Sequence, residues 1–184
     1  RAISVYGEMG NKKIKPKNLK IQSPTINVKS YESITSEKVL DKWIKILNEQ
    51  SVIAVDTETS SLNPLDADLV GVSFSYAPNK ACYIPLAHKN IKGLKKEIVL
   101  KKIKPILEDP SIKKVGQNIK FDFIILKQNN IEINPIEDTM LISYTLDAGT
   151  NRHNLDTLSE IHLSHKTISY KELVGTGKNK LNFS

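Results

Sequence analysis

The feature that most constrains this chain is an acidic pair, Asp56 and Glu58, that directly follows the apolar run 51–55. Side chains two residues apart on a strand point to the same face. Both carboxylates should therefore project together from the carboxyl end of a buried strand, with Thr57 pointing away. Such oxygens suit Mg²⁺ or Mn²⁺, and the pair is costly to hold without a cation. The pattern favours a divalent metal site and phosphoryl chemistry; a solvated or helix-capping pair is the alternative.

The composition indicates one globular domain that carries a positive charge. The chain has 184 residues, 39% of them hydrophobic and 26% charged, with a formal net charge of +7. The charge favours a polyanionic partner. Cys82 is the only cysteine, which excludes an internal disulfide and fits a reducing cytosol. No apolar stretch approaches the roughly 20 residues of a membrane span. The chain begins at Arg1 without Met, so we interpret it as a piece of a longer protein.

The hydrophobic pattern predicts a hairpin of strands followed by strands that alternate with helices. That order indicates a mixed α/β sheet covered by helices. The expected elements, in chain order, are a helix capped by Ser36, a fully buried strand at 52–55, strands at 69–76 and 81–84 joined by a turn at 77–80, a helix at 94–108 interrupted near its end by Pro105, a strand at 113–115, a helix opened by Asn118, and a helix at 137–146.

Two longer segments carry a resemblance to a known family. Residues 52–86 read VIAVDTETSSLNPLDADLVGVSFSYAPNKACYIPL, and residues 114–122 read KVGQNIKFD. They closely resemble the first two motifs of the 3′–5′ exonuclease (proofreading) domain of the bacterial DNA polymerase I family, family A. The similarity continues through EDTM, RHNLDTL and GTGKNK at 137–140, 152–158 and 175–180. It covers the chain from about residue 35 to the end, which chance does not explain.

The resemblance implies a fold and a division of the chain. The fold is the DnaQ-like, ribonuclease-H-like one: a mixed five-stranded sheet flanked by helices, here with the C-terminal part truncated. Residues 31–184 would form the exonuclease domain, and residues 1–30 a linker or N-terminal extension. The implied activity is hydrolysis of the 3′-terminal phosphodiester of DNA, with release of nucleoside monophosphates. A bacterial, cytoplasmic location and a monomeric state are expected with it.

The implied metal ligands are Asp56, Glu58 and Asp122. In this family two Mg²⁺ or Mn²⁺ ions about 3.5–4 Å apart activate water and stabilise the leaving 3′ oxygen. Asp56 would bridge the ions, and Glu58 would serve the ion on the side of the nucleophile. With Asn118 as N-cap, Asp122 would lie about one turn into the next helix and point back toward the cleft.

Other residues match family positions that grip the single-stranded 3′ end of DNA. Leu62 matches a wedge against the terminal bases, and Tyr170 an aromatic that stacks on a base, a contact that reads no sequence. Asn118 matches a contact to the strand, and Arg152 a contact to phosphate. The second implied partner is the polymerase domain of the same parent chain.

One family motif is absent. The family's fourth carboxylate lies in a Tyr-x-x-x-Asp motif on a late helix, and no tyrosine of this sequence is followed by that spacing. The metal site would therefore be incomplete, and we expect the 184-residue chain to be weakly active or inactive. Two alternatives stay open: a non-catalytic domain that braces the polymerase, and a free-standing DnaQ-like exonuclease acting on RNA or DNA.

Overall fold

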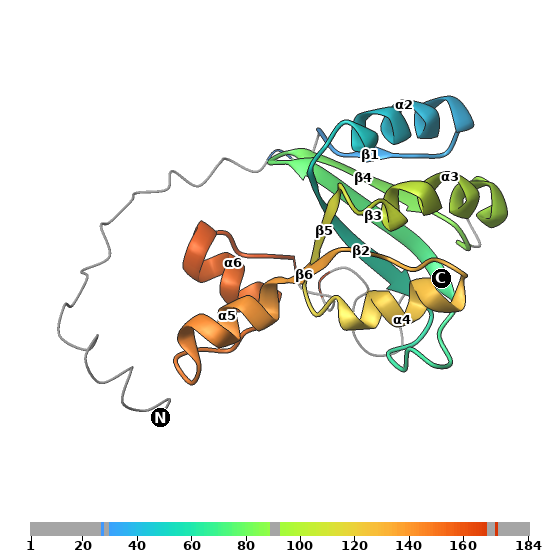
Figure 1. Ribbon diagram of the computed structural model, residues 1–184. Helices are drawn as coiled ribbons and strands as arrows, with labels where there is room; N and C mark the ends of the chain where they lie inside the picture. Colours follow the sequence, from blue (N-terminus) through green and yellow to red (C-terminus); the bar gives the residue numbers. More distant parts are fainter. Residues whose placement is uncertain (1–26, 28–29, 89–92, 169–171, 173–184) are drawn as a thin grey trace.

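The computed structural model describes residues 27, 30–88, 93–168 and 172. These form a mixed sheet of six strands, in the order β1-β4-β3-β2-β5-β6, and five helices (Figure 1). The β2–β3 and β3–β4 pairs are antiparallel, and the other three are parallel. The expected α/β architecture is confirmed, with the two-residue β1 added at one edge of five strands. The strands are β1 (Glu32–Ser33), β2 (Val52–Thr59), β3 (Leu69–Ala77), β4 (Lys80–Pro85), β5 (Lys113–Gly116) and β6 (Ile136–Asp138).

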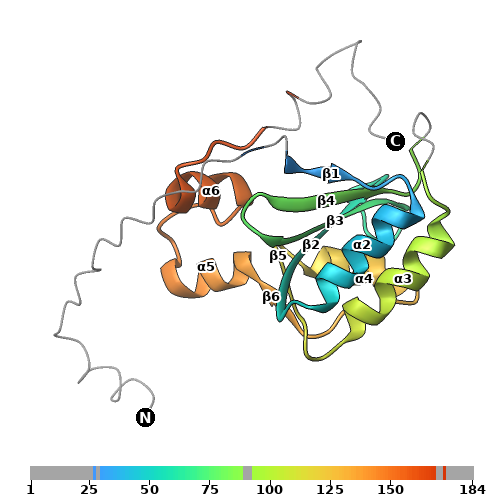
Figure 2. The same ribbon diagram turned by 90° about the horizontal axis from the view of Figure 1, so that it is seen from above.

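Two helices cover one face of the sheet. Figures 1 and 2 show α2 (Glu37–Asn48) and α3 (Lys96–Glu108) side by side on this face. Their apolar residues, spaced three and four apart, bury themselves against the strands, as amphipathic helices do. Ser36 is the N-cap of α2, as expected. The buried residues are Leu40, Trp43 and Leu47 of α2 and Val99, Ile103, Ile106 and Leu107 of α3.

Pro105 does not interrupt α3, contrary to the expectation from the sequence. The helix begins at Lys96, two residues later than expected, and continues through Pro105 to Glu108. Proline removes one hydrogen bond of a helix interior and strains the preceding turn. Ile106 and Leu107, both 0% exposed, follow it directly. Burial of these side chains in the core holds the last turn in place despite the proline.

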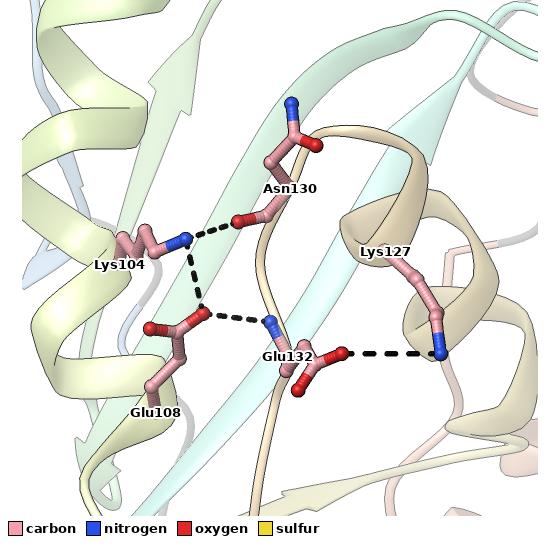
Figure 3. A network of polar contacts seen from close by, with 5 residues as sticks. All are labelled: Lys104, Glu108, Lys127, Asn130 and Glu132. Carbon is pink, nitrogen blue, oxygen red and sulfur yellow. Dashed lines mark hydrogen bonds and ion pairs between the residues drawn. The ribbon is translucent and has the colours of Figure 1, made fainter.

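Polar contacts connect the end of α3 to the segment after α4 (Lys120–Gln128). Lys104 lies 3.3 Å from Glu108 and donates a hydrogen bond to the carbonyl of Asn130. Glu108 accepts a hydrogen bond from the amide of Glu132 at 2.9 Å. Figure 3 shows these contacts bridging the two segments, with the weaker Lys127–Glu132 pair beside them.

The strand at 52–55 is buried on only one side, so the expectation of a fully buried strand is wrong. β2 alternates along its length: Ile53 and Val55 are 1% and 3% exposed, whereas Val52 is 47% exposed. The reason is that α2 and α3 pack on the same face of the sheet (Figure 2). The other face of β2, which we call the open face, carries Val52, Ala54, Asp56 and Glu58.

The segment that leads into α4 also differs from expectation. Asn118 is not the N-cap; α4 begins at Lys120, after Ile119 as N-cap. Asn118 instead adopts a positive φ of 54°, and its amide donates to Asp138 Oδ1 at 3.0 Å. Asparagine tolerates this left-handed conformation better than most residues. The chain therefore turns sharply between the end of β5 and α4.

The expected helix at 137–146 begins two residues later than predicted. Ile136–Asp138 pair with β5 as strand β6, and α5 (Thr139–Asp147) follows. Asp138 caps α5 by accepting a hydrogen bond from the amide of Met140. A further helix, α6 (Leu155–Leu163), was not predicted; Asn154 caps it through the amide of Thr157. Both helices extend from the β6 edge of the sheet (Figure 1). Among the described helices, none combines the length and apolarity needed to cross a membrane.

Candidate functional site

Asp56 and Glu58 lie near the carboxyl end of β2 on its open face. Asp56 is exposed and Glu58 half-buried, while Thr57 between them is buried on the opposite face. This is the alternation that the sequence predicts. Ser73 and Gly71 of β3 pair with Asp56 and Glu58 respectively. The paired positions on β3 thus contribute a small hydroxyl beside Asp56 and no side chain of their own beside Glu58.

Asp122, in the first turn of α4, reaches β2 from the side. Its Oδ1 accepts hydrogen bonds from the amide and the hydroxyl of Thr57, at 2.7 and 2.6 Å. The register explains this contact, because Val115 of β5 pairs with Ala54 and β5 ends one residue later. The amide of Thr57 therefore has no partner from β5, and a buried amide needs one. Asp122, 3% exposed, supplies it and is brought to the site in doing so.

The three carboxylates interact electrostatically. Asp56 is accessible to solvent but crowded by the surrounding protein; this partial loss of water, then the charge of Asp122 and then that of Glu58, raise the pKa of Asp56 to about 7. Burial and the charge of Asp122 also raise the pKa of Glu58. The pKa of Asp122 is raised by burial, although the two hydrogen bonds from Thr57 oppose this. Like charges and removal of water both disfavour ionised carboxylates, so this group of side chains is unfavourable without a cation.

The donor set fits a hard divalent cation, which prefers carboxylate oxygens. Within the described residues, Asp56 and Glu58 form no hydrogen bond or ion pair, and Asp122 has Oδ2 free of the Thr57 bonds. In the same part of the chain, no three His, Cys, Asp or Glu side chains are already grouped as a metal site. The carboxylates are thus close enough to interact without converging on one point.

Of the four residues that match DNA contacts, the structure describes three, and all three are exposed. Leu62, in the loop after β2, is 96% exposed. Asn118 is exposed at the turn into α4, four residues before Asp122. Arg152 is exposed just before α6, and its neighbour His153 is tied to the turn because its carbonyl accepts from Gln117 Nε2 at 2.8 Å. Tyr170 lies outside the described residues.

Sequence reasoning missed two kinds of residue at this site. Thr57 was expected only to point away, yet it holds Asp122 in place. Tyr83 and His88, which hydrogen-bond to each other at 2.6 Å, attracted no notice. Alternation could have placed Tyr83 on the open face once the register was known, because Tyr83 pairs with Ser73, the partner of Asp56. The register itself is not visible in the sequence.

The mixed sheet and its helices place this chain in the ribonuclease-H-like fold class, as the sequence predicted. The catalytic core of RRP6 from Trypanosoma brucei superposes with a TM-score of 0.66 at 16% identity, over 82% of this chain and 40% of that one. NrnC of Brucella melitensis, in a structure with bound Mg²⁺, gives a TM-score of 0.56 at 23% identity, over 80% of this chain and 68% of that one. At such low identity these likenesses show the fold alone.

Sequence comparison defines the family. The family model described as "3′-5′ exonuclease", that of the DNA polymerase A type, matches residues 31–183. DNA polymerase I of Rhizobium leguminosarum is 40% identical over 174 residues, which span 84% of this chain and 17% of that protein. The chain belongs to the 3′–5′ exonuclease domain family of DNA polymerase I. It spans about a sixth of the length of the curated relatives that it matches.

Proposed function

We propose that this chain is the proofreading part of a DNA polymerase I and hydrolyses the 3′-terminal phosphodiester of single-stranded DNA. The observation that carries the proposal is the group Asp56, Glu58 and Asp122 at the end of β2, where loss of surrounding water and then mutual repulsion raise the pKa of Asp56 to about 7. Membership of the exonuclease family gives the reaction class.

The three carboxylates have different tasks in this proposal. Asp56 and Glu58 hold divalent cations, Mg²⁺ or Mn²⁺, on the open face of β2. Asp122 adds its Oδ2 while its Oδ1 stays bound to Thr57, so this ligand comes from a fixed position. Bound cations of this kind supply an activated water and stabilise the charge on the leaving oxygen. Their charge also makes ionised carboxylates favourable where repulsion now opposes them.

The DNA strand is gripped by residues around this group. Leu62 projects from the loop after β2 and packs against the terminal bases, and Arg152 pairs with a phosphate. Asn118 contacts the strand from the turn before α4, and Tyr170 stacks on a base. The Gln117–His153 bond supports joint action of Asn118 and Arg152, because it ties their two segments together. The net charge of +7 favours such a polyanionic partner.

The proposal includes the setting of the domain. Residues 31–184 form an exonuclease domain that works beside a polymerase domain in a monomeric, cytoplasmic bacterial protein, with residues 1–30 as the preceding linker. Because this sequence lacks a Tyr-x-x-x-Asp motif, the 184-residue chain hydrolyses DNA far more slowly than a chain that includes one. The name of the related NrnC structure, which records bound Mg²⁺, is consistent with the cation named here.

A Mn²⁺ titration of the 184-residue chain, followed by electron paramagnetic resonance, tests the proposal. The wild-type chain should bind Mn²⁺ and slowly shorten a single-stranded oligonucleotide from its 3′ end. Asp56→Ala should weaken Mn²⁺ binding by about tenfold or more and abolish the shortening, because loss of a direct ligand should cost at least as much as loss of a residue that supports one. Asp68→Ala, an exposed carboxylate in the loop before β3, is the matched control and should change neither.

Three results would contradict the proposal. An equal Mn²⁺ response of the wild type and Asp56→Ala would exclude the carboxylate group as the metal site. Intact metal binding without any shortening, even by a longer chain that includes a Tyr-x-x-x-Asp motif, would favour the non-catalytic bracing domain instead. Faster shortening of RNA than of DNA would favour a free-standing exonuclease of the same superfamily.

A further inference from the structure

Tyr83 of β4 lies on the same face of the sheet as the carboxylates. Asp56 pairs with Ser73 of β3, and Ser73 pairs with Tyr83. Residues directly opposite each other on adjacent strands point to one face. The three strands lie side by side in the order β4, β3, β2 (Figure 1). Tyr83 is therefore the third member of a row across the sheet that begins at Asp56.

The ring of Tyr83 leans over Gly71 into the next row. A Cβ atom added to Gly71 would lie 1.9 Å from the Tyr83 hydroxyl oxygen, so only glycine leaves room for the ring there. Gly71 pairs directly with Glu58. The hydroxyl thus reaches the row that Glu58 occupies. In agreement with this position, burial and then the charge of Glu58 raise the pKa of Tyr83 to about 12.

His88, three residues after the end of β4, contacts the Tyr83 hydroxyl. Its Nε2 lies 2.6 Å from the Tyr83 hydroxyl oxygen, within hydrogen-bond distance. The two rings also meet edge to face, with centroids 5.7 Å apart and an interplanar angle of 68°. A hydroxyl with its ring packed over a backbone and its oxygen hydrogen-bonded has little rotational freedom. The Tyr83 side chain is therefore held in one position and limits the space available to neighbouring side chains.

Of the three carboxylate side chains, that of Glu58 has the most conformational freedom. Its side chain has three rotatable bonds, and the β2–β3 register shifts between Glu58 and Thr59, so the backbone leaves the strand ladder there. Asp122, by contrast, is fixed by Thr57. A ligand with free rotamers loses that freedom when a cation binds, which weakens binding.

We propose that Tyr83, clamped by His88 over Gly71, is a positioning residue that holds the Glu58 carboxylate beside Asp56 for the divalent cation. This inference rests on the proposed metal site. Tyr83 does not touch the cation; it restricts the places that the Glu58 side chain can occupy. The two residues should act as a unit, because the bond to His88 holds the Tyr83 hydroxyl in place.

Mn²⁺ binding by four variants of the 184-residue chain tests the pair. Tyr83→Phe and His88→Ala should each weaken Mn²⁺ binding about fivefold, which is less than the roughly 10–100-fold losses caused by removing a residue bonded to a metal ligand. The double variant should bind Mn²⁺ no more weakly than either single variant, since both changes remove the same restriction on the Glu58 side chain. His88→Gln, whose side-chain amide can still bond the hydroxyl, should restore most of the affinity. Circular dichroism would confirm that each variant is folded.

The chain offers a matched control. Tyr144 of α5 also meets a histidine edge to face, with its ring centroid 5.2 Å from that of His153. It is 59% exposed and lies on α5, outside the row of residues across β2, β3 and β4. Tyr144→Phe removes the same hydroxyl and should leave Mn²⁺ binding unchanged. A purely structural role of Tyr83 would lower the melting temperature of Tyr83→Phe without changing the Mn²⁺ affinity of the folded chain.

The outcomes separate this inference from the proposed function. Wild-type Mn²⁺ affinity in Tyr83→Phe, or multiplied losses in the double variant, would overturn the positioning role and leave the metal site standing. If Asp56→Ala binds Mn²⁺ as the wild type does, the metal site itself fails. In that case, metal-free crystal structures test the positioning role of Tyr83 and His88. One Glu58 position in the wild type and several in Tyr83→Phe would support the role, and an identical single position in both would overturn it.

Discussion

The neighbouring strands β5 and β2 each carry charged side chains, but these side chains differ in how many hydrogen bonds the protein gives them. Lys114 of β5 is 0% exposed, and its Nζ donates to the carbonyls of Asp109, Ile112 and Asn134 at 2.5–2.7 Å. The carboxylates at the end of β2 receive hydrogen bonds only at Asp122, within the described residues. Burial shifts both groups toward their neutral forms: the pKa of Lys114 falls to about 8, and that of Asp56 rises to about 7.

This difference distinguishes Lys114, which stabilises the fold, from the carboxylates near the end of β2, which are suited to bind a cation. An ammonium has three N–H donors, and Lys114 has three carbonyl acceptors, so the protein satisfies it completely. Its contacts join the loop before β5 to the segment before β6. Carboxylates that repel one another and accept few hydrogen bonds need a bound cation to stabilise them. Shifted pKa values alone would not separate the two regions, because structural charges and functional ones both have them.

Replacement of Lys114 gives the largest expected effect. Lys114→Met should lower the free energy of unfolding by about 3 kcal/mol, because it leaves three inward-facing carbonyls without a partner. Urea denaturation measures this loss. Lys104→Met is the control: Lys104 also donates to a carbonyl, that of Asn130, but its side chain is 45% exposed (Figure 3). Its loss should cost no more than about 0.5 kcal/mol. Equal costs would remove the distinction between the two lysines.

Removal of one carboxylate should have the opposite sign. Asp56→Asn should raise the free energy of unfolding of the metal-free chain by about 1 kcal/mol at pH 8, because it relieves repulsion from Glu58 and Asp122. Thermal denaturation in a chelating buffer measures the gain. Asp68→Asn, in the loop before β3, should show none. A destabilised Asp56→Asn would mean that the carboxylate has a structural partner, as Lys114 does.

The dependence of stability on pH gives the smallest expected effect. A carboxyl whose pKa is raised by folding binds its proton more tightly in the folded state, so stability falls as the pH rises. For Asp56 the fall extends from about pH 4 to about pH 7. Glu32, Glu108 and Asp109, whose pKa values are lowered, give the opposite slope and mask it. The melting temperature of the metal-free wild type minus that of Asp56→Asn should therefore fall over this pH range. A constant difference would contradict the raised pKa.

The sequence predicts the scaffold of the site better than its contacts. Alternation along β2 correctly places Asp56 and Glu58 on one face, because the period of a strand is fixed by its geometry. The family resemblance supplies Asp122, and the structure brings it to β2. The way it arrives was not predictable, since the Thr57 bonds depend on where β5 ends relative to β2.

The remaining errors have one physical origin. A local pattern cannot show which tertiary partner will take over a backbone group. Asn118 was predicted to cap a helix, but its amide donates to Asp138 and its φ is positive. Residues 137 and 138 were predicted to begin a helix, but they pair with β5 as part of strand β6. Tyr83 becomes notable only after β3 aligns it with the carboxylates.

The position of Asp122 has a practical consequence for anyone who wishes to disable this domain without breaking it. One oxygen of that side chain belongs to the architecture, because it completes the edge of β2, and the other is free for chemistry. Alanine would remove both at once, so an inert alanine variant would say nothing about which was missed. Asparagine keeps an acceptor for Thr57 and discards only the charge. It is therefore the replacement suited to trapping an uncut strand on an intact scaffold.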